Sequence, residues 1–97
     1  MPEVYVKYVG KDIAKYFGAT KNPEVVQLAE GSTYGELIEF FYKRFCQCVQ
    51  LKGGKMPNKE LFGAFVFISD GRNLKRISDE PVKNGDEIVV IPADAGG

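Results

Sequence analysis

The chain has 97 residues, 44% of them hydrophobic, and its 13 basic and 13 acidic side chains leave no net charge. This length fits one domain with a single core, and the balanced charge gives no electrostatic footprint for nucleic acid. No apolar run reaches the length of a membrane span and no signal peptide is visible, so we expect a cytoplasmic protein that does not bind membranes.

The side chains that usually carry chemistry are scarce. Histidine is absent, which removes the usual general base and the commonest metal ligand. Cys46 and Cys48 are two residues apart on a predicted helix, so they point to different faces and are poorly placed to form a disulfide or a metal site. No glycine-rich nucleotide motif is complete. We therefore expect no catalytic, metal or cofactor site within the chain itself.

Two strands are predicted at the start of the chain. Residues Glu3–Val9 are rich in β-branched and aromatic side chains, and Lys7 marks their solvent side. Because successive side chains of a strand point to opposite faces, the core side carries Val4, Val6 and Tyr8. Residues Gly10–Pro23 contain turn signals and predict a loop. Residues Glu24–Ala29 predict a second strand that pairs with the first as a hairpin.

A helix is predicted from Thr33 onward. Thr33 and Glu36 have the spacing of a capping box, in which each side chain binds the other's backbone N–H. Apolar residues then recur at helical spacing, at Tyr34, Leu37, Ile38, Phe41, Phe45 and Val49. This stripe predicts a core-facing side, which we favour over an aromatic binding groove.

The second half of the chain predicts strands separated by turns. Residues Leu51–Glu60 hold lysines, glycines and a proline, and indicate a solvated loop. Residues Phe62–Ser69 are apolar on both faces and predict a strand. Asp70–Gly71 is a hairpin signal, and Asn73–Ile77 is a short charged candidate for the returning strand at a sheet edge.

The last strand decides the predicted architecture. Residues Asp86–Ile91 lack polar alternation, which is typical of a central strand, and Pro92 ends them. One helix on one face of a mixed sheet with four or five strands accommodates this order of elements. We therefore predict an α+β fold of the β-grasp (ubiquitin-like) type over residues 1–97, with residues 92–97 as a flexible tail.

This architecture leaves one face of the sheet without a helix. Because the later strands are apolar on both sides, we expect exposed hydrophobic side chains there, and such patches usually mark interaction sites. The candidate partner surface consists of Phe65, Phe67, Val89 and Ile91. The pattern does not decide which parity faces outward, so Val66 and Ile68 are the other possible set, and burial by the loops is a further alternative.

The C-terminal segment resembles that of the ubiquitin-like sulfur carriers, in particular the small subunit of molybdopterin synthase and the archaeal small modifier proteins. The matching positions follow the family's order: Pro81-Val82, Asn84-Gly85-Asp86-Glu87, Ile88–Ile91, Pro92 and Gly96-Gly97. The helix start is also similar, through Thr33, Gly35, Glu36 and Leu37. The resemblance covers most of the chain.

The resemblance implies a chemistry for the tail. The carboxyl of Gly97 would be joined to AMP by a partner enzyme that uses ATP, and sulfur would then replace AMP to leave a thiocarboxylate. Gly96 and Gly97 have no Cβ, so this end can enter a narrow channel. The residues before them would pass through the same channel: Pro92, Ala93, Asp94 and Ala95. Asp94 is equally consistent with a solvated position and with a partner contact.

The resemblance also implies partners. They are a ubiquitin-activating-type adenylating enzyme and the MoaE-like large subunit of molybdopterin synthase, in a heterotetramer. The leading hypothesis is a sulfur carrier for molybdenum or tungsten cofactor synthesis, not an enzyme in its own right and without a bound cofactor. The alternatives are a modifier joined to lysines of acceptor proteins, a carrier for tRNA thiolation, and a β-grasp module that binds without covalent chemistry.

Overall fold

The computed structural model describes residues 2–10, 12–49 and 59–93, and these form a mixed sheet of five strands in the order β2-β1-β5-β3-β4. The strands are β1 (Glu3–Tyr8), β2 (Glu24–Gln27), β3 (Phe65–Ser69), β4 (Arg72–Asn73) and β5 (Glu87–Pro92). β5 is central, as its sequence predicts, and runs parallel to β1 and antiparallel to β3. The hairpins β1–β2 and β3–β4 complete the sheet on either side.

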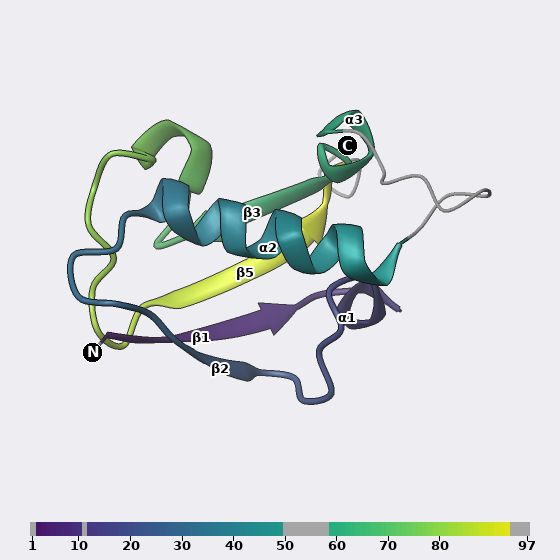
Figure 1. Cartoon of the computed structure of the whole chain (residues 1–97), viewed down its shortest axis with the longest axis horizontal. Coiled ribbons are helices and arrows are strands. Elements are labelled where there is room, and N and C mark those ends of the chain that lie inside the picture. The colour runs from purple at the N-terminus through teal and green to yellow at the C-terminus, as the bar shows by residue number, and fades with distance from the viewer. Residues whose placement is uncertain (1, 11, 50–58, 94–97) are drawn as a thin grey trace.

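One main helix covers one face of this sheet. This helix, α2 (Tyr34–Cys48), crosses β5 and its neighbours in Figure 1. Three short elements surround it: α1 (Ile13–Tyr16), α3 (Lys59–Phe62) and the 3-10 helix η1 (Leu74–Ile77). The predicted β-grasp arrangement is confirmed, with α1 and α3 beside the end of β5 and η1 at the opposite end of the molecule (Figure 1).

The periodic patterns place their side chains as predicted. In β1, Val4 and Val6 are fully buried while Tyr5, between them, is 40% exposed. At the start of α2 the capping box is present, because the Glu36 N–H donates to Thr33 Oγ1 at 3.2 Å and the Thr33 N–H donates to Glu36 Oε1 at 3.4 Å. The apolar stripe of α2 then faces the sheet and supplies much of the core.

Phe17 is the centre of an aromatic core. Its side chain is fully buried, and its ring lies 5.2 to 6.3 Å from those of six other aromatic residues. These residues come from β1, α2, α3 and β3: Tyr8, Phe41, Phe45, Phe62, Phe65 and Phe67. Phe17 directly follows α1, so this short helix brings a central core residue into place.

Three sequence-based assignments need correction. The segment Gly10–Pro23 is not only a loop, since it contains α1. Phe62 ends α3, so the strand predicted from this residue begins at Phe65. The returning strand predicted at Asn73–Ile77 is only Arg72–Asn73, and η1 follows it because Leu74 and Ile77 turn inward at a 3-10 spacing and become buried. Of the predicted loop Leu51–Glu60, residues 51–58 lie outside the described residues.

A polar network ties α2 to the first hairpin. Glu24 on β2 accepts a hydrogen bond from the Tyr8 hydroxyl at 2.8 Å and forms an ion pair with Arg44 of α2 at 2.8 Å. The Asn22 side chain bonds both the N–H and the carbonyl of Tyr8, at 2.9 and 2.7 Å. Burial, and then the bond to Glu24, raise the pKa of Tyr8 above its usual range, so its hydroxyl remains a donor to Glu24 at a pH where a free tyrosine would ionise.

Replacing Phe17 with Ala should lower the free energy of unfolding by about 3–5 kcal/mol, because the change removes a fully buried ring and leaves a cavity. Phe40, half-buried on α2, is the matched control, and Phe40→Ala should cost clearly less. Urea unfolding monitored by circular dichroism measures both. A loss at Phe17 no greater than that at Phe40 would show that Phe17 is not central to the core.

Candidate functional site

The predicted tail begins at the end of β5, where the chain is held on both sides. Pro92 lies opposite Phe65 of β3, and the N–H of Ala93 donates to the Ala64 carbonyl at 2.7 Å. Pro92 and Ala93 are thus fixed to the domain. The remaining tail residues, Asp94, Ala95, Gly96 and Gly97, lie outside the described residues, and their predicted roles stay predictions.

The register of β3 and β5 shows which parity faces away from α2. Phe67 is 1% exposed and its ring stacks on Phe41 of α2, while Phe65 packs on Phe17. The prediction that Phe65 and Phe67 belong to an exposed partner surface is therefore wrong, because both complete the aromatic core beneath the helix.

The alternate positions form the open face of the sheet. Val66 lies opposite Ile91, and Ile68 lies opposite Val89, so these pairs put four aliphatic side chains on one surface. All four are half-buried, including Val89 and Ile91, for which the sequence predicts such a position. We call Val66, Ile68, Val89 and Ile91 the aliphatic quartet.

Charged side chains border the quartet on the side of β1. Lys7 lies opposite Val89, and Tyr5 lies opposite Glu87, in the parallel register of β1 and β5. With Pro23 and Ile88, these residues line a hollow of about 230 Å³. The open face therefore combines an aliphatic centre with a basic and an acidic group at its margin, as docking surfaces commonly do.

The first part of the motif that carries the family resemblance lies at the other end of β5, where it binds three elements together. Asn84 Oδ1 accepts a hydrogen bond from the Glu3 N–H at 2.9 Å, and the Gly85 N–H donates to the Glu3 carbonyl at 2.7 Å. The Asp86 carbonyl accepts from the Tyr5 N–H at 2.8 Å. Gly85 has a φ of 89°, a conformation that side chains with a Cβ rarely adopt. We call Asn84–Asp86 the clamp.

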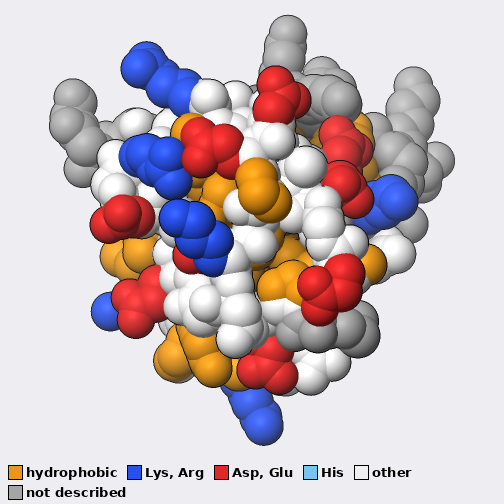
Figure 2. All heavy atoms as spheres, turned by 90° about the vertical axis from the view of Figure 1, so that its left-hand side faces the viewer, with side chains coloured by type: hydrophobic (Ala, Val, Ile, Leu, Met, Phe, Trp, Pro, Cys, Tyr) orange, Lys and Arg blue, Asp and Glu red, His pale blue; other side chains and the backbone are white. Residues whose placement is uncertain are grey.

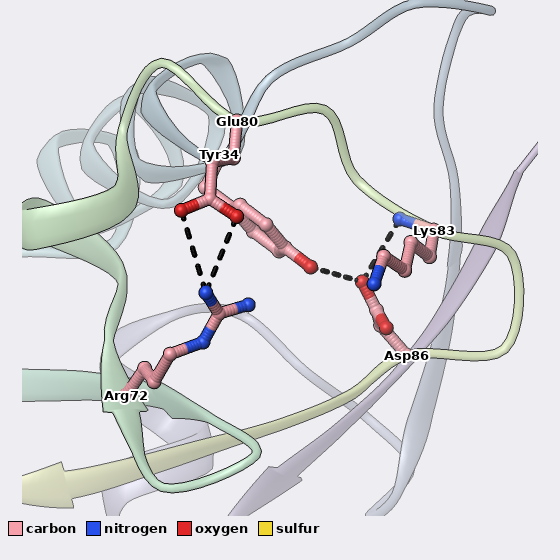
Figure 3. A network of polar contacts seen from close by, with 5 residues as sticks. All are labelled: Tyr34, Arg72, Glu80, Lys83 and Asp86. Carbon is pink, nitrogen blue, oxygen red and sulfur yellow. Dashed lines mark hydrogen bonds and ion pairs between the residues drawn. The ribbon is translucent and has the colours of Figure 1, made fainter.

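The Asp86 side chain extends the clamp to α2. Its Oδ2 accepts hydrogen bonds from the Tyr34 hydroxyl at 2.5 Å and from the Lys83 N–H at 2.9 Å (Figure 3). Glu80 accepts from the Tyr34 N–H through its carbonyl and forms an ion pair with Arg72 through its carboxylate at 3.2 Å. The clamp thus joins the first turn of α2 to the starts of β1 and β5.

This arrangement assigns the clamp residues to the fold rather than to chemistry. Figure 2 looks at the end of the molecule that carries the clamp, where acidic and basic side chains are spread between small hydrophobic areas. The predicted tail leaves from the opposite end of β5 (Figure 1). The sequence shows the motif, but the contact between Tyr34 and Asp86 joins residues 52 positions apart and has no local signal.

Among the described residues no group of three or more Cys, Asp or Glu side chains is placed to hold a metal ion, and no helix is long and apolar enough to cross a membrane. Cys46 is buried and Cys48 is exposed, and both are free thiols.

Comparisons with known proteins agree with this geometry. The model of the ThiS family matches residues 13–97. No curated protein sequence matches significantly. A Pyrococcus furiosus structure titled "Putative molybdopterin converting factor, subunit 1" is similar with a TM-score of 0.61 and 25% identity, over 95% of this chain and 98% of that one. The small archaeal modifier protein 1 of Haloferax volcanii has a TM-score of 0.58 at 16% identity, over 95% and 98% of the two chains.

The clamp can be tested by the variant Asp86→Ala. It removes the acceptor of the Tyr34 hydroxyl, a buried donor, and should lower the free energy of unfolding by about 1–3 kcal/mol. The variant Tyr34→Phe should add little to the loss once Asp86 is replaced, and a double-mutant cycle by urea unfolding measures this coupling. Asp79→Ala, at an exposed carboxylate in the same loop, is the control. Equal losses at Asp79 and Asp86 would argue against the clamp.

The same contact predicts a pH dependence. Burial, and then the hydrogen bond to Asp86, raise the pKa of Tyr34 to about 12 from its usual value of 10.0. Because the folded-state pKa is raised, the stabilisation is complete below pH 10 and is lost as the pH rises toward 12. Tyr34→Phe should therefore show a smaller decrease in melting temperature across this interval than the unsubstituted chain. An identical decrease in both would contradict the assignment.

Proposed function

The chain belongs to the ThiS family of ubiquitin-like sulfur carriers, and from this membership we propose that it carries sulfur on the carboxyl group of Gly97. The observation that supports the proposal is the end of β5, from which the tail sequence continues, because β5 is a central strand beside an open aliphatic face. A partner can therefore bind the domain and receive the end of the chain at the same time.

The proposed chemistry begins with a carboxylate. An α-carboxyl has a pKa of about 3.3–3.7, so it is ionised at neutral pH and is a poor acyl donor. A carboxylate oxygen attacks the α-phosphorus of ATP and pyrophosphate leaves, which gives an acyl-adenylate. A sulfide equivalent supplied by a partner then attacks the acyl carbon and displaces AMP, so the carboxylate becomes a thiocarboxylate.

The catalytic groups for both steps belong to partner proteins. The chain has no histidine, and the Asp86 carboxylate at the clamp is bonded to the Tyr34 hydroxyl at the end of β5 away from the tail. We infer that a ubiquitin-activating-type adenylating enzyme binds ATP and activates Gly97. The chain itself supplies the carboxyl group and the docking surface.

We propose the pterin precursor of the molybdenum or tungsten cofactor as the recipient of the sulfur. The likeness to the Pyrococcus furiosus protein, which is named as a molybdopterin converting factor subunit, supports this choice. The chain would then act as the small subunit of molybdopterin synthase, with Gly97 inserted into a MoaE-like large subunit. Amide transfer to lysines of acceptor proteins uses the same activated carboxyl, and the experiment below distinguishes it.

The aliphatic quartet is the proposed docking surface. Half-buried aliphatic groups that continue toward the end of β5 allow a partner to bury apolar surface close to the start of the tail. Lys7 and Glu87, at the margin, would orient the partner more than they add affinity.

Loading of Gly97 with sulfur can be measured by intact mass. Protein purified from its native host should carry one sulfur in place of one oxygen at its C-terminus, and removal of Gly97 should abolish the exchange. The melting temperature should not change on this deletion, because Gly97 lies beyond the last described contact of β5, at Ala93. Gly-Gly remnants on lysines of other proteins would indicate a modifier. Neither product, with an active adenylating enzyme present, would overturn the proposal.

Docking through the quartet predicts that Ile68→Ser weakens the complex with the large subunit or the adenylating enzyme about tenfold or more, through the loss of a buried aliphatic contact of roughly 1–2 kcal/mol. Val25→Ser is the matched control, because Val25 is 54% exposed and lies on β2, the edge strand that is farthest from β3 in the sheet. Isothermal calorimetry measures both. Equal affinities of the two variants would place the docking surface elsewhere.

A further inference from the structure

The end of β5 is surrounded by apolar side chains that the open face does not include. Tyr16 of α1 and Leu61 of α3 are each 43% exposed, although both are large hydrophobic residues. The Tyr16 ring lies 5.7 Å from that of Phe65, which is opposite Pro92 in the register of β3 and β5. Tyr16 is therefore next to the start of the tail at Pro92 and Ala93, which we call the root, on the side of the sheet that α2 covers.

The turn after α3 approaches the root from another direction. The Ala64 N–H donates to the Leu61 carbonyl at 3.1 Å, and the Ala64 carbonyl accepts from the Ala93 N–H at 2.7 Å. α1 and α3 thus lie on either side of the end of β5 (Figure 1). We call Tyr16, Leu61, Ala64 and Pro92 the collar.

The length of the tail limits where a partner can bind. Gly97 lies four positions after Ala93, and a fully extended chain spans at most about 3.3–3.6 Å per residue, so Gly97 reaches no farther than roughly 14 Å from Ala93. The molecule is 38 Å along its longest axis. An active site that takes Gly97 is therefore confined to the end of the molecule that bears the collar.

A channel that admits the tail must also have walls around it. Because Gly97 lies so close to the end of β5, the rim of that channel must contact the surface of the domain around Pro92 and Ala93. The collar includes two exposed large side chains, those of Tyr16 and Leu61, and α1 also carries an ion pair between Asp12, at its N-cap, and Lys15, at 3.2 Å, as a polar margin. This is the composition of an interface core with a polar rim.

We propose that the collar binds the rim of the tail channel in the adenylating enzyme, so that the interface continues from the quartet around the end of β5 onto α1 and α3. The inference rests on the proposed activation of Gly97. Tyr16 and Leu61 are positioning residues: they hold the domain against the channel mouth and do not touch the reacting carboxyl.

The test is ATP–pyrophosphate exchange by the adenylating enzyme of the native host, with the full chain as the variable substrate. Tyr16→Ser and Leu61→Ser should each raise the KM for the chain about tenfold and change kcat less than twofold. Tyr16→Phe keeps the ring and should retain the unsubstituted KM. Val25→Ser is the control on the distant edge strand, and its KM should not change.

The outcomes separate the two proposals. Absence of exchange with the unsubstituted chain would overturn the proposed function and this inference with it. Normal exchange, with unchanged KM for both Tyr16→Ser and Leu61→Ser, would overturn the inference alone. Melting temperatures accompany each assay, because Tyr16 also contacts Phe65; a raised KM that occurs only in variants with a lowered melting temperature would mean a structural role and would equally overturn the inference.

Discussion

The position of β5 between β1 and β3 is the constraint on which the rest of the structure depends. A strand bonded on both sides carries side chains on both faces of the sheet, and in β5 nearly all of these are aliphatic. Only one face is covered by α2, and there Ile88 and Val90 are fully buried. The other face leaves Val89 and Ile91 half-exposed. The apolar open surface is therefore a consequence of a central strand in a fold with one main helix.

The two ends of β5 differ in their surroundings: the clamp lies at the start of the strand, and the tail begins at its end. At its start, the clamp joins β1, β5 and α2 through hydrogen bonds, with Gly85 in a conformation that suits glycine. At its end, the chain leaves the sheet between α1 and α3. The residues that most resemble the family's motif thus include a set that holds the fold and a set proposed for chemistry. We therefore expect a substitution at Asp86 to act on stability and, under the proposed function, one at Gly97 to act on the reaction.

Local patterns predicted the regular elements well. Alternation gave the inward side of β1, and the spacing of Thr33 and Glu36 gave the start of α2. The short elements were missed because four residues, as in α1, hold too little periodicity to distinguish a helix from a loop. The parity of β3 could not be predicted, because aromatic and aliphatic residues alternate there and both can be buried. The contacts of Phe65 and Phe67 with Phe17 and Phe41 decide it, and they form only in the folded chain.

The attachment of the tail has a consequence for how a partner engages it. Tension on the tail acts along β5, and the ladders to β1 and β3 resist it on both sides. Among the described residues, the bond from Ala93 to Ala64 is the last in this series, so we expect it to open before the ladders. Its release adds at most about 3.6 Å to the reach of the carboxyl, the length of one extended residue. This increase in reach is small compared with the size of a protein surface. A partner therefore cannot bring Gly97 into a distant active site by pulling residues out of β5. It has to approach the domain closely, and the hydrophobic surroundings of the root make that approach favourable.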